Sequence, residues 1–474
     1  MASQQPPPPP PPGDAASATT ITALGDDLLR EIFLRLPSLA SLVRAALACH
    51  TFLAAVTSSG PFRRRFRELH PPPLLGFFFD PDGPAIPSFA PLRRRADPDL
   101  AAAVRGGDFF LTRVPGDHDD AAPGWEIQDC RGGRVLFLNP RTRTDQIAAY
   151  DPLTRALHLV PRPPEDITFG CRGYFTYLNH FILPPSDDED PGSVRVLCTC
   201  HDDSQARAAV FSSATGEWQI FPWAHAFKRR RGDDKYWLYS GSLVNGSVYW
   251  THTNKPYMLV LNTATMRFSR IDLPTYLKGQ GHSFRVGETK DGEPCIVGVV
   301  VFSLLVWYWR PDDNGVEKWI LHKMFPLQAE VLELTEGSPE EHAQLKVIET
   351  IDGYVYLSTY ETFNDPDVPC WFMSFCLETE KLEKFFQKKY DCHVYPYIMP
   401  WPPALLGNKE IQKHFMDYII NDTLGAISVA HLIRAGPQSP LNARSPDCLQ
   451  LAALLFMAVD FAKRGAPAEM LLAL

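Results

Sequence analysis

The chain has 474 residues, which is enough for two or three domains and for a core that needs no disulfide or metal support. Its 46 Lys and Arg against 55 Asp and Glu give a net charge of −9, which disfavours general nucleic-acid binding. Hydrophobic residues are 45% and charged residues 21%, as in an ordinary globular protein. No uncharged apolar run reaches the roughly 18 residues of a membrane span, so no membrane association is expected.

The amino-terminal residues 1–20 are expected to form a disordered, proline-rich leader, because they combine the tract Pro6–Pro12 with little apolar content. A secretory signal would need an apolar segment at this place. The ten cysteines include no CxxC pair. We therefore expect reduced thiols and a cytoplasmic or nuclear protein.

Residues 21–68 are predicted to form a small three-helix domain. Apolar residues recur at the spacing of one helix face, Pro37 ends the first helix, and Ser38 can cap the second. Pro61 is expected to break the chain after the third. A unit of roughly 45 residues is near the lower size limit for independent folding, so a partner that covers its apolar face would stabilise it.

Residues 69–124 are expected to be a linker with one possible strand, Leu74–Asp80, and residues 125–403 are predicted to be β structure. Two motifs repeat imperfectly in this second region. One is a glycine turn followed by an aromatic strand, at Gly132–Phe137, Asn245–Trp250 and Asp352–Leu357. The other is a strand, a tight turn containing Thr and a second strand, at Tyr150–Leu157, Phe211–Trp218, Leu261–Phe268 and Phe375–Leu382.

The copies of the second motif, with a looser copy near residue 308, are 61, 50, 47 and 67 residues apart. A period near ~50 residues is typical of kelch-like β-propeller blades, whose sheets bury both faces by stacking around an axis. Five blades are predicted, and a sixth is expected from residues 74–120 or 387–403. The fold class is therefore α+β multidomain, with a propeller-like domain and a helical tail of unassigned role at residues 404–474.

The amino-terminal unit resembles an F-box. An F-box usually opens with Leu-Pro and carries Cys-Lys-x-Trp in its third helix, where this chain has Leu24-Gly25 and Cys49–Phe52. The remainder is similar to the propeller-type associated domain of plant F-box proteins. The residues that carry the F-box resemblance are Leu24, Leu28, Leu29, Ile32, Phe33, Leu36, Pro37, Leu42, Cys49, Phe52, Phe62 and Phe66.

The resemblance implies a non-catalytic substrate receptor of an SCF-type (Skp–cullin–F-box) ubiquitin ligase. The F-box would bind a Skp-type adaptor and through it a cullin, and the β domain would bind an unknown protein substrate. An apolar helix face docking in a partner's groove is compatible with this reading. The candidate adaptor-binding residues are Leu24, Leu28, Leu29, Ile32, Phe33, Leu36, Pro37, Leu42 and Phe52.

No catalytic, cofactor-binding or metal-binding residue is predicted, since the chain has no P-loop, GxSxG, HExxH or EF-hand pattern. Cys198–His201 is the densest group of potential ligands, but residues 198 and 200 of a strand face away from 201, which favours structural thiols. Asp187–Asp190 and Lys228–Arg231 are expected to be solvated loops. One alternative function is a propeller that binds or converts a small ligand in its central funnel. The other is a scaffold whose F-box, altered at Gly25, His50 and Phe52, does not recruit the ligase.

Overall fold

The computed structural model divides the chain into two compact units, Pro71–Trp401 and the combination of Met1–His70 with Pro402–Leu474. The proline-rich leader, Leu24 and the predicted helical tail lie outside the described residues. The structure describes residues 25–81, 86–92, 98–115, 124–139, 146–171, 176–177, 180–184, 193–202, 205–225, 241–251, 256–278, 283–312, 314–336, 344–360, 369–389 and 393–401.

The described part of the amino-terminal unit has four helices, not the expected three: α1 (Asp26–Leu34), α2 (Leu39–Leu47), α3 (His50–Thr57) and α4 (Gly60–Leu69). The additional helix is α4. Pro61 lies in its first turn, where a helix needs no amide donor, so the proline begins a helix. Ser59 caps α4 by accepting from the Phe62 amide, and Ser38 caps α2 as predicted by accepting from the Ser41 amide.

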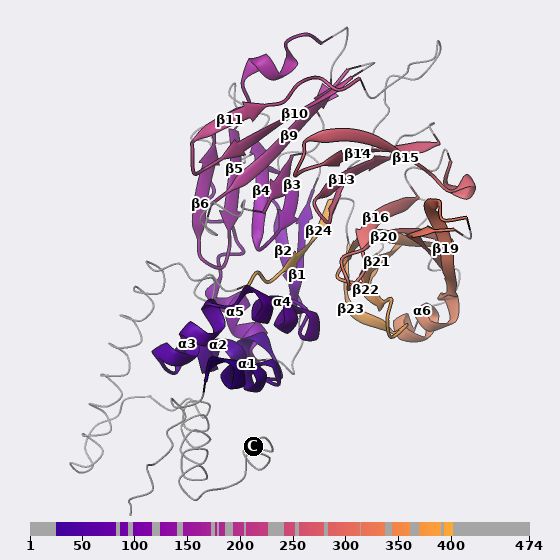
Figure 1. The fold of residues 1–474 in the computed structure, drawn as a ribbon. Coiled ribbons are helices and arrows are strands. Elements are labelled where there is room, and N and C mark those ends of the chain that lie inside the picture. The colour runs from indigo at the N-terminus through magenta and orange to yellow at the C-terminus, as the bar shows by residue number, and fades with distance from the viewer. Residues whose placement is uncertain are drawn as a thin grey trace, which may run out of the picture. The chain divides into compact units, whose positions relative to one another are not determined.

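Pro71–Trp401 forms a six-bladed β-propeller (Figure 1). Each blade is an antiparallel sheet, and the predicted five blades plus one are all present. Blade 1 holds β3 (Glu126–Arg131), β4 (Arg134–Asn139), β5 (Gln146–Asp151) and β6 (Ala156–Val160); blade 2 holds β7 (Thr176–Tyr177), β8 (Phe181–Leu183), β9 (Arg195–His201), β10 (Ala206–Ser212) and β11 (Glu217–Ile220). Blade 3 holds β12 (Ser242–Val244), β13 (Ser247–Thr251), β14 (Tyr257–Asn262) and β15 (Arg267–Asp272); blade 4 holds β16 (Phe284–Glu288), β17 (Pro294–Val300), β18 (Ser303–Pro311) and β19 (Glu317–Pro326). Blade 5 holds β20 (Gln344–Ile351), β21 (Tyr354–Tyr360), β22 (Cys370–Cys376) and β23 (Leu382–Lys388); blade 6 holds β1 (Leu74–Asp80), β2 (Ser88–Pro91) and β24 (His393–Ile398).

Blade 6 closes the ring with strands from both ends of the β region. β1 pairs antiparallel with β24 from Leu74↔Ile398 to Asp80↔His393, and Figure 1 shows the orange β24 beside β1. Residues 69–124, expected as a linker, thus supply two of the three strands of this blade together with the helix α5 (Pro98–Gly106). The two sources expected as alternatives for a sixth blade therefore combine in one sheet, which removes the open edge that an unclosed ring would have.

Six apolar clusters fill the six interfaces between neighbouring blades. Successive residues of a strand face opposite sides of the sheet, so consecutive side chains enter different clusters. On β1, Phe77 packs toward blade 5 with Phe372, whereas Phe78 packs toward blade 1 with Phe137. A strand buried on both faces has a continuous apolar sequence, which explains the run Phe77–Phe79.

The repeat motifs correspond to two kinds of tight turn. The first joins the inner strand of a blade to the next strand, and both its residues have positive φ, as at Gly132-Gly133 and Asn245-Gly246. This is the geometry that suits the twist of paired strands. In the second motif the residue after Thr has positive φ, and the positions are Arg155, Gly216, Met266 and Glu380.

These turns define two faces of the propeller. The turn face carries the two short turns of each of blades 1, 3, 4 and 5, together with the turn between β10 and β11 of blade 2. The loop face carries the connections from one blade to the next that contain the short helices η2 (Glu165–Thr168), η3 (Thr275–Leu277) and α6 (Gln328–Thr335). The inner strands β3, β8, β12, β16, β20 and β24 all begin at the loop face. Among the described residues, no helix has the length and apolarity needed to cross a membrane.

Candidate functional site

Four of the predicted adaptor-binding residues form the interior of the helical unit. Leu29, Phe33, Leu42 and Phe52 are each at most 5% exposed. The rings of Phe33 and Phe52 meet edge to face, with centroids 5.4 Å apart, and join α1 to α3. These side chains hold the helices together and have no surface to offer a partner.

Four other predicted residues offer more surface to a partner. Leu28 is 49% exposed and Pro37 is exposed, whereas Ile32 and Leu36 are half-buried. Leu28 and Ile32 are four residues apart and so share one side of α1. The remaining predicted residue, Leu24, lies outside the described residues.

Arg30 fixes α1 against the end of α3. Its Nε donates to the Ala55 carbonyl at 3.0 Å and its Nη2 donates to Ser58 Oγ at 3.1 Å. The same guanidinium pairs with Asp26 and Asp27 at 3.1 and 2.9 Å. A cation at the last carbonyls of a helix is favourable, so Arg30 sets the position from which Leu28 faces the solvent.

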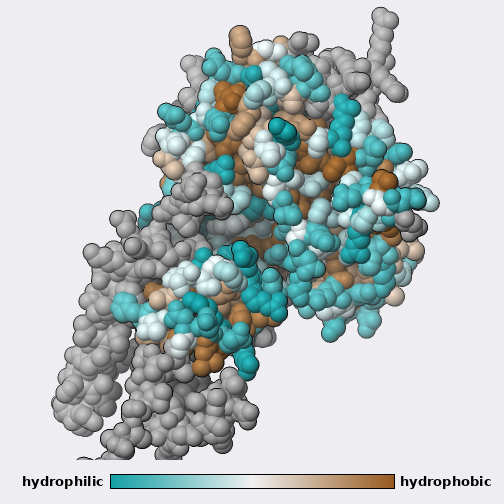
Figure 2. All heavy atoms as spheres, viewed as in Figure 1, coloured by the Kyte–Doolittle hydropathy of each residue, from teal (hydrophilic) through white to brown (hydrophobic). Residues whose placement is uncertain are grey.

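A shallow hollow lies between α1 and α4 beside Leu28. Leu34, Pro61 and Phe62 contribute its apolar lining, and Glu31 and Arg65 contribute charges. Figure 2 shows apolar patches of limited size among hydrophilic residues on this unit. The α4 side of the hollow was missed in the sequence because Pro61 was interpreted as a break, although a proline after a Ser cap is a helix-start signal.

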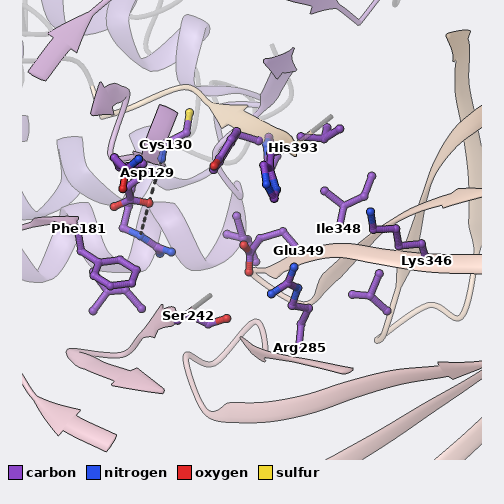
Figure 3. Close-up of a pocket in the computed structure, with 18 residues that line it drawn as sticks. Asp129, Cys130, Phe181, Ser242, Arg285, Lys346, Ile348, Glu349 and His393 are labelled. Carbon is purple, nitrogen blue, oxygen red and sulfur yellow. Dashed lines mark hydrogen bonds and ion pairs between the residues drawn. The ribbon is translucent and has the colours of Figure 1, made fainter. Parts of the chain in front are cut away.

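The second candidate site is the central channel of the propeller, which is lined by the inner strands of all six blades (Figure 3). Its lining combines apolar side chains with charged ones. The charged or titratable residues that line it, apart from a cysteine and a tyrosine, are Asp129, Arg131, Arg285, Lys346, Glu349 and His393. The enclosed volume is about 100 Å³, below the roughly 300–1,000 Å³ of a pocket for a drug-sized ligand.

Asp129 joins two blades inside this channel. Its Oδ2 accepts from the Ile182 amide of blade 2 at 2.9 Å and its Oδ1 accepts from the Cys130 amide at 2.9 Å. Arg131 Nε lies 3.9 Å from Oδ1. Burial raises the pKa of Asp129, and the Arg131 charge and the two amides offset part of that rise.

Arg131 is the common partner of the deeper acids. Burial lowers its pKa, but Asp129, Glu349 and Glu288 raise it by more. Burial also raises the pKa of Glu349, against the charges of Arg131 and Arg285. The charge of Arg131 is therefore favoured by acids of three blades, Asp129 of blade 1, Glu288 of blade 4 and Glu349 of blade 5.

Cys198, Cys200 and His201 are buried in β9. No three His, Cys, Asp or Glu side chains in the described part of the chain are placed to hold a metal ion together. Burial raises the pKa of Cys200 to about 12, the behaviour of a structural thiol. The acidic run Asp187–Asp190 and the basic run Lys228–Arg231 lie outside the described residues.

Residues 374–473 match the family model named RNA dependent RNA polymerase. The chain is 76% identical over 62 residues to a probable RNA-dependent RNA polymerase 2 of Oryza sativa subsp. japonica and 61% identical over 62 residues to RNA-dependent RNA polymerase 2 of Arabidopsis thaliana. Each match covers 13% of this chain and 5% of the polymerase, so the chain spans about a twentieth of these relatives.

A solved structure of a DUF4221 family member from Bacteroides vulgatus aligns with 58% of this chain and 84% of its own, at 12% identity and a TM-score of 0.33. TolB of Acinetobacter baumannii aligns with 63% of this chain and 61% of its own, at 12% identity and a TM-score of 0.31. Scores this low carry no argument about function.

The strongest comparison covers the propeller. Residues 126–405 match the family model described as F-box protein AT5G49610-like, beta-propeller. The matched span is more than half of the chain and includes the whole of blades 1 to 5 together with β24. The protein therefore belongs to the family of F-box protein AT5G49610-like β-propellers.

Proposed function

We propose that this protein is the non-catalytic substrate-recognition subunit of an SCF-type E3 ubiquitin ligase in the cytoplasm or nucleus. In this proposal residues 21–68 are the F-box and bind a Skp-type adaptor, and through it a cullin. The propeller binds the target protein. The observation that carries the proposal is the family match of the propeller, which follows a helical unit that leaves Leu28 exposed.

The exposed face of α1 supports this assignment energetically. Complete burial of an apolar side chain contributes ~1.5–3 kcal/mol. Because Leu28 is 49% exposed and Ile32 and Leu36 are half-buried, these side chains with Pro37 supply about half of the full value, roughly 3–6 kcal/mol before costs. Association costs ~4–15 kcal/mol. Since the two ranges overlap, each exposed anchor has a large effect on affinity, and the loss of one is measurable.

The test is binding of the full chain to a purified Skp-type adaptor. We expect Leu28→Asp to weaken binding at least tenfold, because it places a charge in the apolar contact. Leu159→Asp is the matched control, since Leu159 is 57% exposed on β6 of the propeller. Leu29 is unsuitable for this test because it is 1% exposed and a charge there would unfold the unit.

Equal binding by the wild-type chain and Leu28→Asp would refute the contact, and failure of the wild-type chain to bind any Skp-type adaptor would refute the ligase assignment. The second outcome would favour a ligand-binding or scaffolding propeller that is not coupled to ubiquitination. The charged lining of the central channel is the observation that supports this second function.

A further inference from the structure

The amino-terminal helical unit is basic in a protein that is acidic overall. Residues 25–70 contain seven arginines and four acids, which gives this segment a net charge of +3. The whole chain carries −9, so the remaining residues carry −12. A unit whose charge is opposite to that of the rest of the chain favours a partner of its own kind, namely an acidic one.

Ion pairs within the unit use three of its four acids. Arg30 pairs with Asp26 and Asp27 at 3.1 and 2.9 Å, and Arg65 pairs with Glu68 at 2.8 Å. Two arginines thus neutralise three acids. The excess of positive charge therefore lies on the other arginines of the unit.

Arg35 is one of these other arginines, and it is available to a partner. Its side chain is exposed, and it makes no hydrogen bond or ion pair with the residues that the structure describes. Glu31, one turn earlier on α1, is the fourth acid of the unit and is also exposed. Within the described part of the chain no ion pair joins the two, so each charge meets solvent.

Arg35 lies on the side of α1 that the proposed adaptor contact uses. Leu28, Ile32 and Arg35 follow one another at i, i+4 and i+7, which is the spacing of one side of a helix. Arg35 directly follows the last residue of α1, and its φ of −89° and ψ of −4° remain in the helical region. The exposed Pro37 comes two residues later. The apolar stripe of α1 therefore ends in a displayed guanidinium.

A guanidinium at the edge of an apolar contact favours a carboxylate on the partner. It stays charged and presents its N–H donors in a fixed fork, so it binds a carboxylate through two parallel hydrogen bonds. A partner without an acid at this place would remove water from Arg35 and give nothing in return. Nucleic acid matches less well, because its binding is dominated by phosphates, which offer no apolar contact to Leu28 and Ile32.

We propose that α1 docks on an acidic surface of the Skp-type adaptor and that Arg35 pairs with a carboxylate of that surface beside Leu28 and Ile32. The net charge of +3 draws the two proteins together, and the pair at Arg35 fixes the register of the contact. This inference rests on the proposed function. It adds the sign of the adaptor's surface and one specificity-determining residue to a contact that otherwise consists of apolar side chains.

The first measurement is the salt dependence of binding between the full-length chain and a purified Skp-type adaptor in biolayer interferometry. We expect the association rate constant to fall at least threefold between about 50 and 300 mM NaCl, because salt screens exposed charges. The dissociation rate constant should change less, since the apolar contact of Leu28 and Ile32 is insensitive to screening.

The second measurement compares charge changes on one side of α1, which should act with opposite signs. Arg35→Gln should weaken adaptor binding about threefold and Arg35→Glu at least tenfold, whereas Glu31→Gln should strengthen it about twofold. Gln is a good helix former, so the two Gln variants test the charges even if Arg35→Glu disturbs the end of α1. Arg267→Glu is the matched control, because Arg267 is exposed on β15 of the propeller.

The outcomes separate this inference from the ligase role. Equal binding by the wild-type chain and both Arg35 variants, an equal loss in Arg267→Glu, weaker binding by Glu31→Gln, or an association rate that salt does not change would each overturn the inference and leave the ligase role intact. A wild-type chain that binds no Skp-type adaptor at either salt concentration would refute the ligase role, and this inference with it.

Discussion

Ring closure by β1 can be tested by removing one side chain. Phe77 is fully buried, and its ring centroid lies 5.8–6.0 Å from those of Tyr356, Phe372, Phe385 and Phe386 in blade 5. A buried Phe→Ala change costs ~3–5 kcal/mol, and four aromatic neighbours place Phe77→Ala toward the upper end. With an unfolding entropy of ~2.1 cal/mol/K per residue over Pro71–Trp401, the Tm of the propeller should fall by roughly 6 °C.

Tryptophan fluorescence isolates this transition. All ten tryptophans lie between Trp125 and Trp401, so the signal reports the propeller and not the amino-terminal helices. Phe110→Ala is the matched control, because Phe110 is 89% exposed and its loss should change the Tm little. If Phe77→Ala and Phe110→Ala unfold at the same temperature, β1 does not close the ring and the reasoning is wrong.

Two further predictions concern stability and use the same fluorescence signal. Burial lowers the pKa of His180 to about 4, so below pH 6.5 the folded chain binds fewer protons than the unfolded chain. The free energy of unfolding should therefore fall by about 3 kcal/mol between pH 6.5 and 4. His180→Gln should remove this fall and exposed His393→Gln should retain it, so identical pH profiles of the two variants would contradict the assignment. Gly216 has φ +73° and open space where a Cβ would be added, so Gly216→Ala should lower the free energy of unfolding by ~1–2 kcal/mol through backbone strain alone. Gly106 has equally open space but no positive φ, so Gly106→Ala should lower it by less than about 0.5 kcal/mol. Equal losses in the two variants would contradict the strain argument.

The β repeat was predictable because it is encoded locally. Asn245-Gly246 and Asp352-Gly353 are sequence signals for turns that need positive φ at two residues, and both adopt it. Asp151 and Asn262 begin the second turn by accepting from amides two and three residues later. A local signal that recurs at a regular spacing therefore predicts the five blades that are continuous in sequence without any knowledge of long-range contacts.

Ring closure and the functional surfaces depend on contacts that the sequence does not display. The pairing of Leu74 with Ile398 joins residues more than 300 positions apart, so neither segment alone identified the sixth blade. The apolar spacing of α1 predicted a helix but could not separate buried Leu29 from exposed Leu28, because adjacent residues differ only in which partners tertiary packing provides. Arg285, Lys346 and His393 are isolated residues in the sequence, and only the ring brings them to one opening.

Ring closure also divides the propeller into two faces with different uses. β1 begins and β24 ends at the turn face, where Tyr397 donates to the Gly133 carbonyl at 2.9 Å. The chain therefore enters and leaves the propeller at that face, and a Cβ at Gly133 would lie 2.2 Å from Pro400. The turn at Gly133 is therefore in close contact with the segment that leaves the propeller, so few residue types are tolerated in it. In the described part of the propeller, the two ends of the chain meet at the turn face and not at the loop face, so the loop-face connections can differ in sequence without disturbing closure.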